Sequence, residues 1–560
     1  MGATCLLLVA AMCFLAMASA QQPLFAAEKA NSGKNNGRAV NGKIKSTQIN
    51  PSALQARTIT LNFFDGDVTA VRDRFDNDQG KLLWVGHMDG DTYSEVHLTY
   101  YKQALSGVVT MLSGEVYEIV YAGVEDTYDV YQVDESTIPV DSDAVLMPPS
   151  EDPPMSRRHL LGSRPLAEGA GGRRGLRQVD PLNQLDLAIF YTSTTRERYG
   201  GTAGAESFIL NAIANSNTAY LNSGVDLTLR VVYMGEHPDI LEQSSMSGTL
   251  TTFYPNSYTN AMRDKYGADA ATFITEDVGS CGIAYMMCDR ARGGSRISPF
   301  RSCLLYPPQR LNCAVPRPPL PTQPLSLTCA ARLGVPRRTT TTFSYPYSVV
   351  ASGCLSYKSL THEIGHNQGV SHDIANAGTA LYSNYGYGWQ DPNADFRTIL
   401  AYDCPGGCPR INYLSNPAVI YTTTGAPMGR EYTGGNTKGA NVARAINESR
   451  QYASAWRTFN SALAAPTAAP GSLAIAEKGS DIELTWTPPG GDEDGYEIQR
   501  SSDGSTWTDL GTVRLASGTS YTDVGAAAAS YQYRVRAENY LGTSAWEGPV
   551  SIIPVPTPVP

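Results

Sequence analysis

The chain has 560 residues, which at ordinary domain sizes predicts roughly three or four domains. Hydrophobic residues make up 42% and charged residues 17% of the chain, so its composition is that of a globular protein and excludes a disordered or fibrous one. The formal net charge of −10 argues against a nucleic-acid-binding protein, which normally presents a basic surface. After residue 20, no stretch is apolar over the ~18 or more residues that a membrane-spanning helix needs, so we expect no transmembrane segment.

Residues 1–20 have the pattern of a signal peptide. Residues 5–17 form an apolar core, and Ala18-Ser19-Ala20 matches the small-x-small pattern of a cleavage site. No Lys or Arg precedes the core, which departs from the usual pattern, but the core is too short for a membrane anchor. We therefore expect a secreted, extracellular protein. The cysteines that follow the signal are candidates for disulfides in an oxidising compartment.

The next part of the chain divides into a polar segment and a β-rich segment. Residues 21–56 are rich in Gly, Asn and Lys, and predict a flexible leader. Residues 57–144 contain short β-rich runs, such as Thr58–Phe64, Lys81–Met88 and Glu95–Tyr101, separated by Gly and Asp turn signals. These runs predict a small all-β domain, and its N-terminal position resembles that of a propeptide.

Residues 145–178 predict a linker. They contain Pro, Gly and clustered arginines, including Arg157-Arg158 and Arg173-Arg174. Two interpretations stay open at this point. The segment is either a solvated connection or a processing site, because exposed basic linkers are easily cut by proteases.

Residues 179–460 predict a domain that combines strands and helices. A buried strand at 185–191 is followed by helical periodicity at 203–222 and by a second strand at 227–235. A helix between two strands predicts a layered α/β domain. The helix-like segment 440–459 closes the domain.

Residues 289–341 interrupt this pattern with nine prolines, nine arginines and one acidic residue. Proline lacks an N–H group and fixes φ, so the segment cannot form a core helix or strand. One interpretation is a long surface loop, which could bind a partner as a polyproline segment. Another is an artefactual insertion, such as untranslated gene sequence carried into the chain. A structureless loop of roughly 50 residues is unusual in a compact domain, so we favour an artefact or a disordered loop over a functional element.

After an Ala/Pro-rich linker at 461–470, residues 471–555 show short strands with turn signals. Trp486 and the alternating run that begins Tyr531-x-Tyr533 resemble the fibronectin type III domain. That resemblance implies a β-sandwich in which Trp486 packs between two sheets. It also implies a tyrosine that fixes a corner, for which we favour Tyr531.

The segment Leu360–Asp373 carries most of the chemistry, because it holds three of the seven histidines of the chain. His362 and His366 are four residues apart, so on a helix they share one face and can bind one ion. Gly369 can adopt a positive φ without strain, which permits a turn that brings His372 to the same ion. Three imidazoles with an open fourth position are typical of a catalytic zinc site.

Two acidic residues accompany these histidines. We predict that Glu363 is the general base, which takes a proton from a zinc-activated water and passes it to the leaving amine. We predict that Asp373 hydrogen-bonds nearby backbone and fixes the turn. The complete pattern HExxHxxGxxHD resembles the metzincin metallopeptidases, and its last aspartate resembles their adamalysin/reprolysin branch. The resemblance implies a twisted sheet with helices and a substrate extended along an edge strand.

Metzincins carry a methionine-containing turn beneath the zinc site, and the matching stretch is Phe396–Cys404. Leu400 stands where the family has methionine. That methionine is a hydrophobic floor and not a ligand, and leucine has a similar volume, so we expect the packing to survive. Tyr402 stands where some metzincins place a tyrosine near zinc. It is either a catalytic residue that steadies the oxyanion or a core tyrosine.

Cysteine positions suggest two disulfides. Cys281 and Cys354 resemble family positions and could pair, and Cys404 and Cys408 could close a small loop, although connectivity does not follow from sequence. The expected propeptide, 21–178, contains no cysteine. It cannot cap zinc with a thiolate, so any inhibition must be steric.

The sequence also bears on glycosylation and on calcium binding. Asn447-Glu448-Ser449 is a sequon for N-glycosylation in a secreted protein. The family resemblance also allows a calcium ion, but no set of calcium ligands is visible in the sequence.

Together these features predict a multidomain protein with a β-rich propeptide-like region, an α/β (α+β) metzincin domain and a C-terminal β-sandwich. The predicted function is a secreted zinc endopeptidase that hydrolyses extracellular proteins or peptides. The C-terminal module would attach it to extracellular matrix or cell-wall components, or act as a spacer. Leu400 and the insertion motivate an alternative, a catalytically impaired metzincin that acts in adhesion or matrix binding. The intact histidines and Glu363 favour the enzyme.

Overall fold

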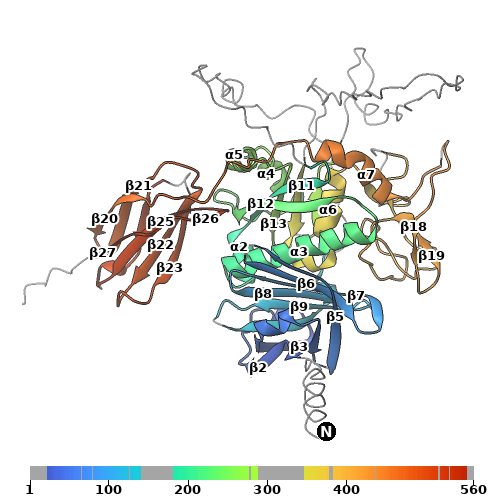
Figure 1. Ribbon diagram of the computed structural model, residues 1–560, viewed down its shortest axis with the longest axis horizontal. Helices are drawn as coiled ribbons and strands as arrows, with labels where there is room; N and C mark the ends of the chain where they lie inside the picture. Colours follow the sequence, from blue (N-terminus) through green and yellow to red (C-terminus); the bar gives the residue numbers. More distant parts are fainter. Residues whose placement is uncertain are drawn as a thin grey trace, which may run out of the picture.

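The computed structural model describes residues 22–139, 181–287 and 346–551, apart from short gaps at 65, 79, 125, 277–278, 378–382, 436, 515–517 and 529. These residues form an N-terminal domain (22–139), a central domain (181–460) and a C-terminal domain (471–551), as Figure 1 shows. The expected signal peptide, the linker at 145–178 and the insertion at 289–341 lie outside the described residues. None of the described helices combines the length and the apolarity that crossing a bilayer requires.

The N-terminal domain is a ten-stranded, barrel-like sheet, drawn in blue in Figure 1. Neighbouring strands are antiparallel, except that β1 and β4 are parallel. Alternation along each strand builds the core, since Ile59 and Leu61 of β4 are fully buried between half-buried neighbours. In spatial order the strands are β1 (Gln22–Pro23), β4 (Thr58–Asn62), β5 (Asp67–Asp78), β6 (Lys81–Met88), β7 (Asp91–Tyr101), β8 (Ala104–Thr110), β9 (Val116–Tyr121), β10 (Tyr128–Val133), β3 (Ala39–Ile49) and β2 (Phe25–Lys29).

The prediction of a flexible leader over 21–56 is wrong for the described residues, because they contribute three strands to this sheet. Strand β3 pairs with β10 on one side and with β2 on the other. Two polar residues of this segment bind a buried carboxylate. Asn35 Nδ2 and Ser46 Oγ donate to the carboxylate of Asp129, at 3.0 and 2.6 Å, and Asp129 is fully buried. Their polarity therefore serves internal hydrogen bonding.

The central domain is built on a five-stranded sheet in the order β12-β11-β13-β15-β14. Its strands are parallel except for the edge strand β14, which is antiparallel to β15. The strand predicted at 185–191 and the helix predicted at 203–222 are confirmed as β11 and α3. The bounds are β11 (Gln184–Tyr191), α3 (Thr202–Asn222), β12 (Thr228–Glu236), β13 (Ala270–Thr275), β14 (Gly282–Ala284) and β15 (Tyr347–Ala351).

Helices cover both faces of this sheet. On β11, Leu187 and Ile189 pack with α3, α6 and α7, whereas Ala188 and Phe190 pack with α4 and α5 on the opposite face. The last helix is shorter than the predicted segment 440–459. The remaining elements are α2 (Ser193–Arg198), α4 (Met246–Phe253), α5 (Ser257–Tyr266), η5 (Ser352–Tyr357), α6 (Ser359–Asn367), β16 (Ser371–Asp373), β17 (Tyr387–Gly388), β18 (Asn416–Tyr421), β19 (Ala426–Met428) and α7 (Val442–Ala453).

The C-terminal domain consists of two antiparallel sheets that share one hydrophobic core. Trp486 of one sheet packs against Tyr496 of the other, with ring centroids 5.2 Å apart. Of Tyr531 and Tyr533, only Tyr533 is fully buried, and its hydroxyl donates to Asp523 at 2.8 Å. The fibronectin type III assignment stays a prediction. The sheets are β20 (Gly471–Lys478), β21 (Asp481–Thr487) and β24 (Ser520–Asp523), and β23 (Thr508–Arg514), β22 (Gly495–Ser501), β25 (Gln532–Asn539), β26 (Gly542–Thr543) and β27 (Glu547–Ser551).

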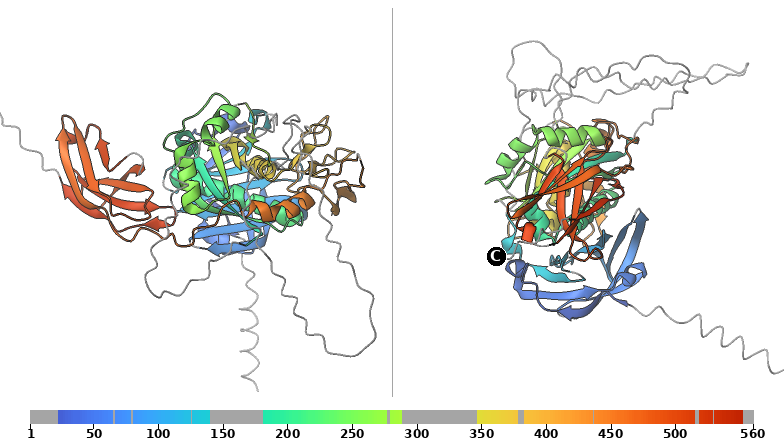
Figure 2. Two further views of the ribbon diagram at one scale, coloured as in Figure 1. Left: turned by 90° about the horizontal axis from the view of Figure 1, so that it is seen from above. Right: turned by 90° about the vertical axis from the view of Figure 1, so that its left-hand side faces the viewer.

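The N-terminal domain lies against helix α3 of the central domain (Figures 1 and 2). The contact is buried and polar. Asn211 Nδ2 donates to the His97 carbonyl at 2.8 Å, and Ser207 Oγ lies 2.9 and 3.1 Å from the carbonyls of Thr99 and Ala104. These side chains on α3 therefore hydrogen-bond three backbone carbonyls of β7 and β8 across the domain contact.

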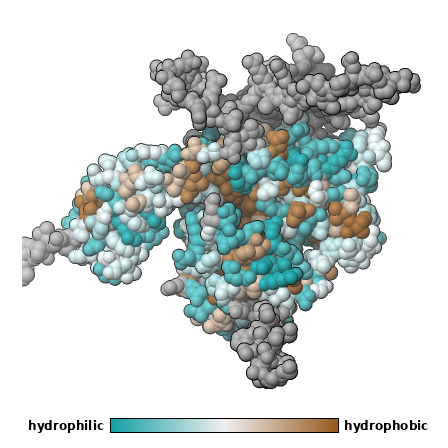
Figure 3. All heavy atoms as spheres, in the orientation of Figure 1, coloured by the Kyte–Doolittle hydropathy of each residue, from teal (hydrophilic) through white to brown (hydrophobic). Residues whose placement is uncertain are grey.

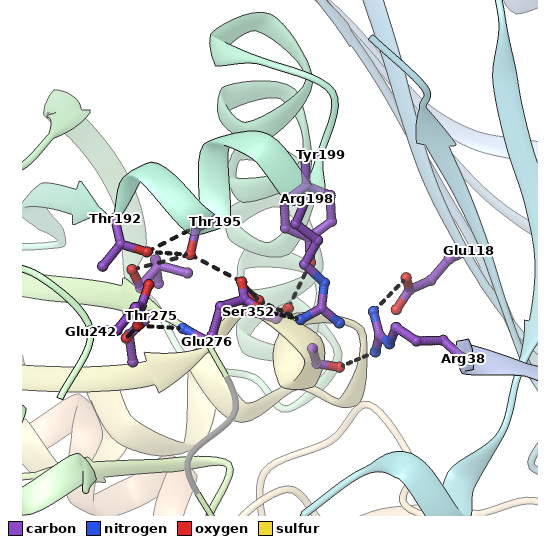
Figure 4. A network of polar contacts seen from close by, with 12 residues as sticks. Arg38, Glu118, Thr192, Thr195, Arg198, Tyr199, Glu242, Thr275, Glu276 and Ser352 are labelled. Atoms are coloured by element: carbon purple, nitrogen blue, oxygen red, sulfur yellow. Dashed lines mark hydrogen bonds and ion pairs between the residues drawn. The ribbon is translucent and has the colours of Figure 1, made fainter. Parts of the chain in front are cut away.

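A second contact reaches the segment that precedes α6. Arg38 forms an ion pair with Glu118 at 3.3 Å, and its Nη2 donates to the carbonyl of Gly353 at 2.9 Å. Ser356 Oγ donates to Glu118 at 2.6 Å. Figure 4 shows the Arg38–Glu118 pair close to Ser352, the first residue of η5. The N-terminal domain thus contacts the turn that leads directly into α6.

The C-terminal domain attaches to the central domain through α5. Lys265 Nζ donates to the carboxylate of Asp494 at 2.7 Å. Tyr540 packs against the hydrophobic core formed with α4 and α5. On the face drawn in Figure 3, hydrophobic side chains gather where these two domains meet. This attachment does not use α6.

Candidate metal centre

Helix α6 carries two of the three predicted histidine ligands. It begins after Lys358, which has a left-handed backbone with φ of 66°, and all nine of its residues are buried. His362 and His366 lie on one face, with ring centroids 4.7 Å apart. The predicted helical spacing is therefore present in the structure.

The chain turns directly after α6. Gly369 has φ of +87°, its N–H donates to the His366 carbonyl at 2.9 Å, and Val370 N–H donates to the Gly365 carbonyl at 3.3 Å. These two bonds form a Schellman motif, in which the left-handed position suits glycine. The chain then enters β16, which contains His372.

The three histidines meet in one buried cluster. One ring nitrogen from each of His362, His366 and His372 lies within 4.8 Å of the others, and Nε2 of His366 is 3.2 Å from Nε2 of His372. Nδ1 of His362 faces the Ile399 carbonyl at 3.0 Å, and Nδ1 of His366 faces the Val370 carbonyl at 2.8 Å. A carbonyl only accepts, so each Nδ1 carries the proton and each Nε2 keeps its lone pair for a ligand.

Glu363 is fully buried beside the edge strand β14. A Cβ atom on Gly282 of that strand would lie 2.5 Å from Glu363 Oε1. No larger residue fits at position 282 without displacing the carboxylate, so the glycine lets the edge strand approach Glu363. Sequence reasoning missed Gly282, because nothing local marks a glycine that faces a residue about 80 positions away.

Asp373 and Tyr402 lie beside the third histidine. The Asp373 carboxylate accepts hydrogen bonds from the backbone of Ala375 and Asn376, and from Tyr402 N–H at 3.2 Å. It thereby ties β16 to the stretch predicted to resemble the methionine turn. The ring of Tyr402 packs on that of His372, with centroids 4.3 Å apart.

Leu400 is fully buried beneath α6. A Cβ atom on Gly365 would lie 3.4 Å from a Leu400 methyl carbon, so the leucine side chain lies directly against the helix. Its role as the floor of a metal site stays a prediction.

Both expected cysteine pairs are disulfides in the structure. Cys281–Cys354 joins the start of β14 to η5, and Cys404–Cys408 closes a short loop after the Leu400 turn. Asn447 lies within α7, where its Nδ2 donates to the Gly224 carbonyl at 3.0 Å. A glycan on that nitrogen would have to displace this hydrogen bond.

A cavity of about 720 Å³ lies between the N-terminal and central domains, one side chain away from the histidine cluster. Tyr402 forms part of its wall. Lys358, Arg397 and Arg410 line it from the central domain. Sequence reasoning did not single out these three cations, because they belong to no motif and come together only through folding.

A family model described as Metallo-peptidase family M12 matches residues 182–415. The chain is also 24% identical over 411 residues to a peptidyl-Asp metalloendopeptidase of Stenotrophomonas maltophilia, covering 69% of this chain and 81% of the relative. A protein of the same name from Xanthomonas campestris pv. campestris is 24% identical over 416 residues, covering 71% and 83%. These matches support a metalloendopeptidase, with a bound metal ion and protein or peptide substrates.

Other similarities are shorter or weaker. A peptidyl-Asp metalloendopeptidase of Pseudomonas fragi is 42% identical over 73 residues, which is 13% of this chain and 50% of the relative. A solved structure titled "Structure of a chaperone-substrate complex" is 16% identical with a TM-score of 0.32, and the match covers 49% of this chain and 39% of that one. That score is too low to assign a fold.

Proposed function

We propose that this chain is a secreted, zinc-dependent metzincin endopeptidase. The observation that carries the proposal is the buried cluster of His362, His366 and His372, with Glu363 beside it. Zinc–nitrogen bonds of about 2.0–2.1 Å in a tetrahedron separate two ligand nitrogens by roughly 3.3 Å. The distance of 3.2 Å between Nε2 of His366 and Nε2 of His372 fits that requirement.

The residues of the cluster and those around it have distinct chemical roles. The three histidines would hold the ion, which in such a site polarises the scissile carbonyl and activates a water molecule. Glu363 takes a proton from the attacking water and transfers it to the leaving amine. Its burial beside Gly282 keeps bulk water away and strengthens its electrostatic interactions. Tyr402, beside His372, is the candidate for steadying the oxyanion.

The edge strand β14 provides the place for an extended substrate. It is the last strand of the central sheet and pairs only with β15 among the described strands. A substrate that adds a strand here gains backbone hydrogen bonds next to Glu363. Because the relatives are named peptidyl-Asp metalloendopeptidases, we also propose that this chain cleaves peptide bonds next to aspartate.

The flanking domains complete the proposed precursor. The N-terminal domain borders the cavity beside the histidine cluster, which supports a propeptide that blocks access sterically. Cleavage in the linker at 145–178 would allow it to leave. The C-terminal domain would tether the enzyme to extracellular matrix or cell wall, or act as a spacer.

Replacement of the proposed base tests this function. In Glu363→Gln, we expect casein cleavage by the trypsin-treated, full-length chain to fall roughly 10²- to 10⁴-fold, the usual contribution of a general base. Zinc content should stay at one ion per chain, because Glu363 is not a ligand. Glu477→Gln, an exposed change on β20, serves as the matched control and should keep full activity. Equal activity of Glu363→Gln and wild type would refute the proposed role.

A further inference from the structure

The cavity between the N-terminal and central domains reaches the proposed metal site through a single side chain. Its volume is about 720 Å³, and Tyr402 forms part of its wall. The Tyr402 ring also packs on His372, with ring centroids 4.3 Å apart. A group bound against Tyr402 would therefore lie one side chain away from the proposed metal site.

The wall that belongs to the central domain is cationic. Among the described residues that line it there, Lys358, Arg397 and Arg410 are basic and Asp403 is the one acid. Arg397 comes within 3.5 Å of Asp403, whose side chain is 58% exposed, so solvent screens this pair. The central domain thus brings an excess of positive charge to a partly enclosed cavity.

Backbone contacts hold the two guanidinium groups in place. Arg397 Nη1 donates to the Ala401 carbonyl at 3.1 Å, and Arg410 Nη1 donates to the Tyr357 carbonyl at 3.1 Å. Arg397 and Arg410 also face each other across a β-bridge. A guanidinium has five N–H donors, so one backbone carbonyl occupies only part of its hydrogen-bonding capacity. The cationic wall is therefore organised before any ligand arrives.

The opposite wall, from the N-terminal domain, is acidic. Its described lining residues include Glu95 and Glu135 and no basic residue. Glu95 Oε2 lies 3.5 Å from Lys358 Nζ, with both side chains nearly buried. Burial raises the pKa of Glu135, and Arg397 opposes that rise, so these two groups interact across the cavity. Carboxylates therefore already face these cations in the present structure.

We infer that this cavity is the subsite that recognises an acidic substrate side chain, with Lys358, Arg397 and Arg410 as its specificity-determining residues. The inference rests on the proposed peptidase function and names the residues behind its substrate class. A planar guanidinium binds a carboxylate through two parallel hydrogen bonds. A neutral side chain cannot provide the same charged, paired contact. While the N-terminal domain is bound, Glu95 pairs with Lys358 and Glu135 interacts with Arg397, and both carboxylates would leave with that domain.

A pair of peptides tests the inference on the wild-type enzyme alone. The peptides share one sequence and differ only by aspartate or asparagine at the residue next to the scissile bond. We expect kcat/KM of the trypsin-treated, full-length chain to be roughly tenfold to a hundredfold higher for the aspartate peptide, as for a hydrogen bond to a charged group. Equal kcat/KM for the two peptides would overturn the inference and leave the proposed function standing. If the chain cleaved neither the two peptides nor casein, both the inference and the proposed function would be overturned.

Substitutions then test which residues determine the preference for aspartate. In Arg397→Gln and Arg410→Gln, the aspartate-to-asparagine ratio of kcat/KM should fall by tenfold or more. Arg430→Gln removes the same charge from an arginine of the central domain that does not line the cavity, and should keep the wild-type ratio. Circular dichroism identifies variants that fail to fold, and Lys358→Gln provides a third variant. Folded variants that all keep the wild-type ratio would overturn the assignment.

Discussion

Leu400 is the residue at which the proposed site departs from the family pattern. It is fully buried against α6, where a methionine side chain of similar volume would fill the same space. We expect Leu400→Met to change the free energy of unfolding by less than about 1.5 kcal/mol and to leave casein cleavage near the wild-type rate. Leu400→Ala should cost about 2–5 kcal/mol because it creates a cavity. Urea denaturation measures both. A large gain of activity in Leu400→Met would instead favour the impaired-metzincin alternative.

Residue identity predicted the histidine cluster but not the cationic wall, for a physical reason. His362, His366 and Glu363 are placed by one helix, so their spacing in sequence determines their spacing in space. Arg397 and Arg410 approach Lys358 only after the chain has folded. No local pattern marks such a meeting, and a lone arginine on a surface loop is ordinary.

The turn after α6 is the element that sets the third histidine in place. Gly369 has φ of +87° in a Schellman motif, so Gly369→Ala should destabilise the chain by roughly 1 kcal/mol and misplace His372. We expect weaker zinc binding in a competition titration against a chelator. Gly425→Ala is the matched control, because Gly425 also has a positive φ and meets no atom within 4 Å of an added Cβ. Gly425→Ala should also lower the free energy of unfolding, but it should leave the zinc affinity unchanged. An unchanged zinc affinity in Gly369→Ala would contradict this account of the turn.

Strand pairing explains which elements could be predicted. Strand β11 and helix α3 follow from local periodicity, and both were predicted close to their observed bounds. Strand β3 could not be predicted in this way, because its partner β10 lies far along the chain and its Ser46 binds the buried Asp129. Composition alone does not distinguish polar residues that face water from those that face a buried carboxylate.

At the scale of the whole molecule, the contact between the N-terminal and central domains should weaken in acid. His97 is fully buried at this contact, and burial lowers its pKa to about 3, with Lys358 and Arg74 acting in the same direction. In a separated domain its pKa would return to about 6.5. The separated form therefore binds the proton, and docking is fully favoured above about pH 6.5 and lost progressively toward pH 3.

Gel filtration of the linker-cleaved chain measures this dependence. We expect the two parts to elute together at pH 8 and to separate increasingly between pH 6.5 and 4, with the effect worth about 1.4 kcal/mol per unit of pKa difference. Burial raises the pKa of Glu95, which favours docking in acid, so the histidine is isolated by comparison with His97→Gln. That variant should lose less docking on acidification than wild type. An equal or greater loss in the variant would refute the role of His97.

Metal titration tests the central claim most directly. The full-length chain, treated with trypsin and stripped of metal by a chelator, is titrated with zinc while bound metal and casein cleavage are measured together. The cluster of three histidines predicts that cleavage is absent without metal, rises in proportion to bound zinc and levels off at one ion per chain. Cleavage that survives complete removal of metal, or one tightly bound zinc per chain with no cleavage, would contradict the account.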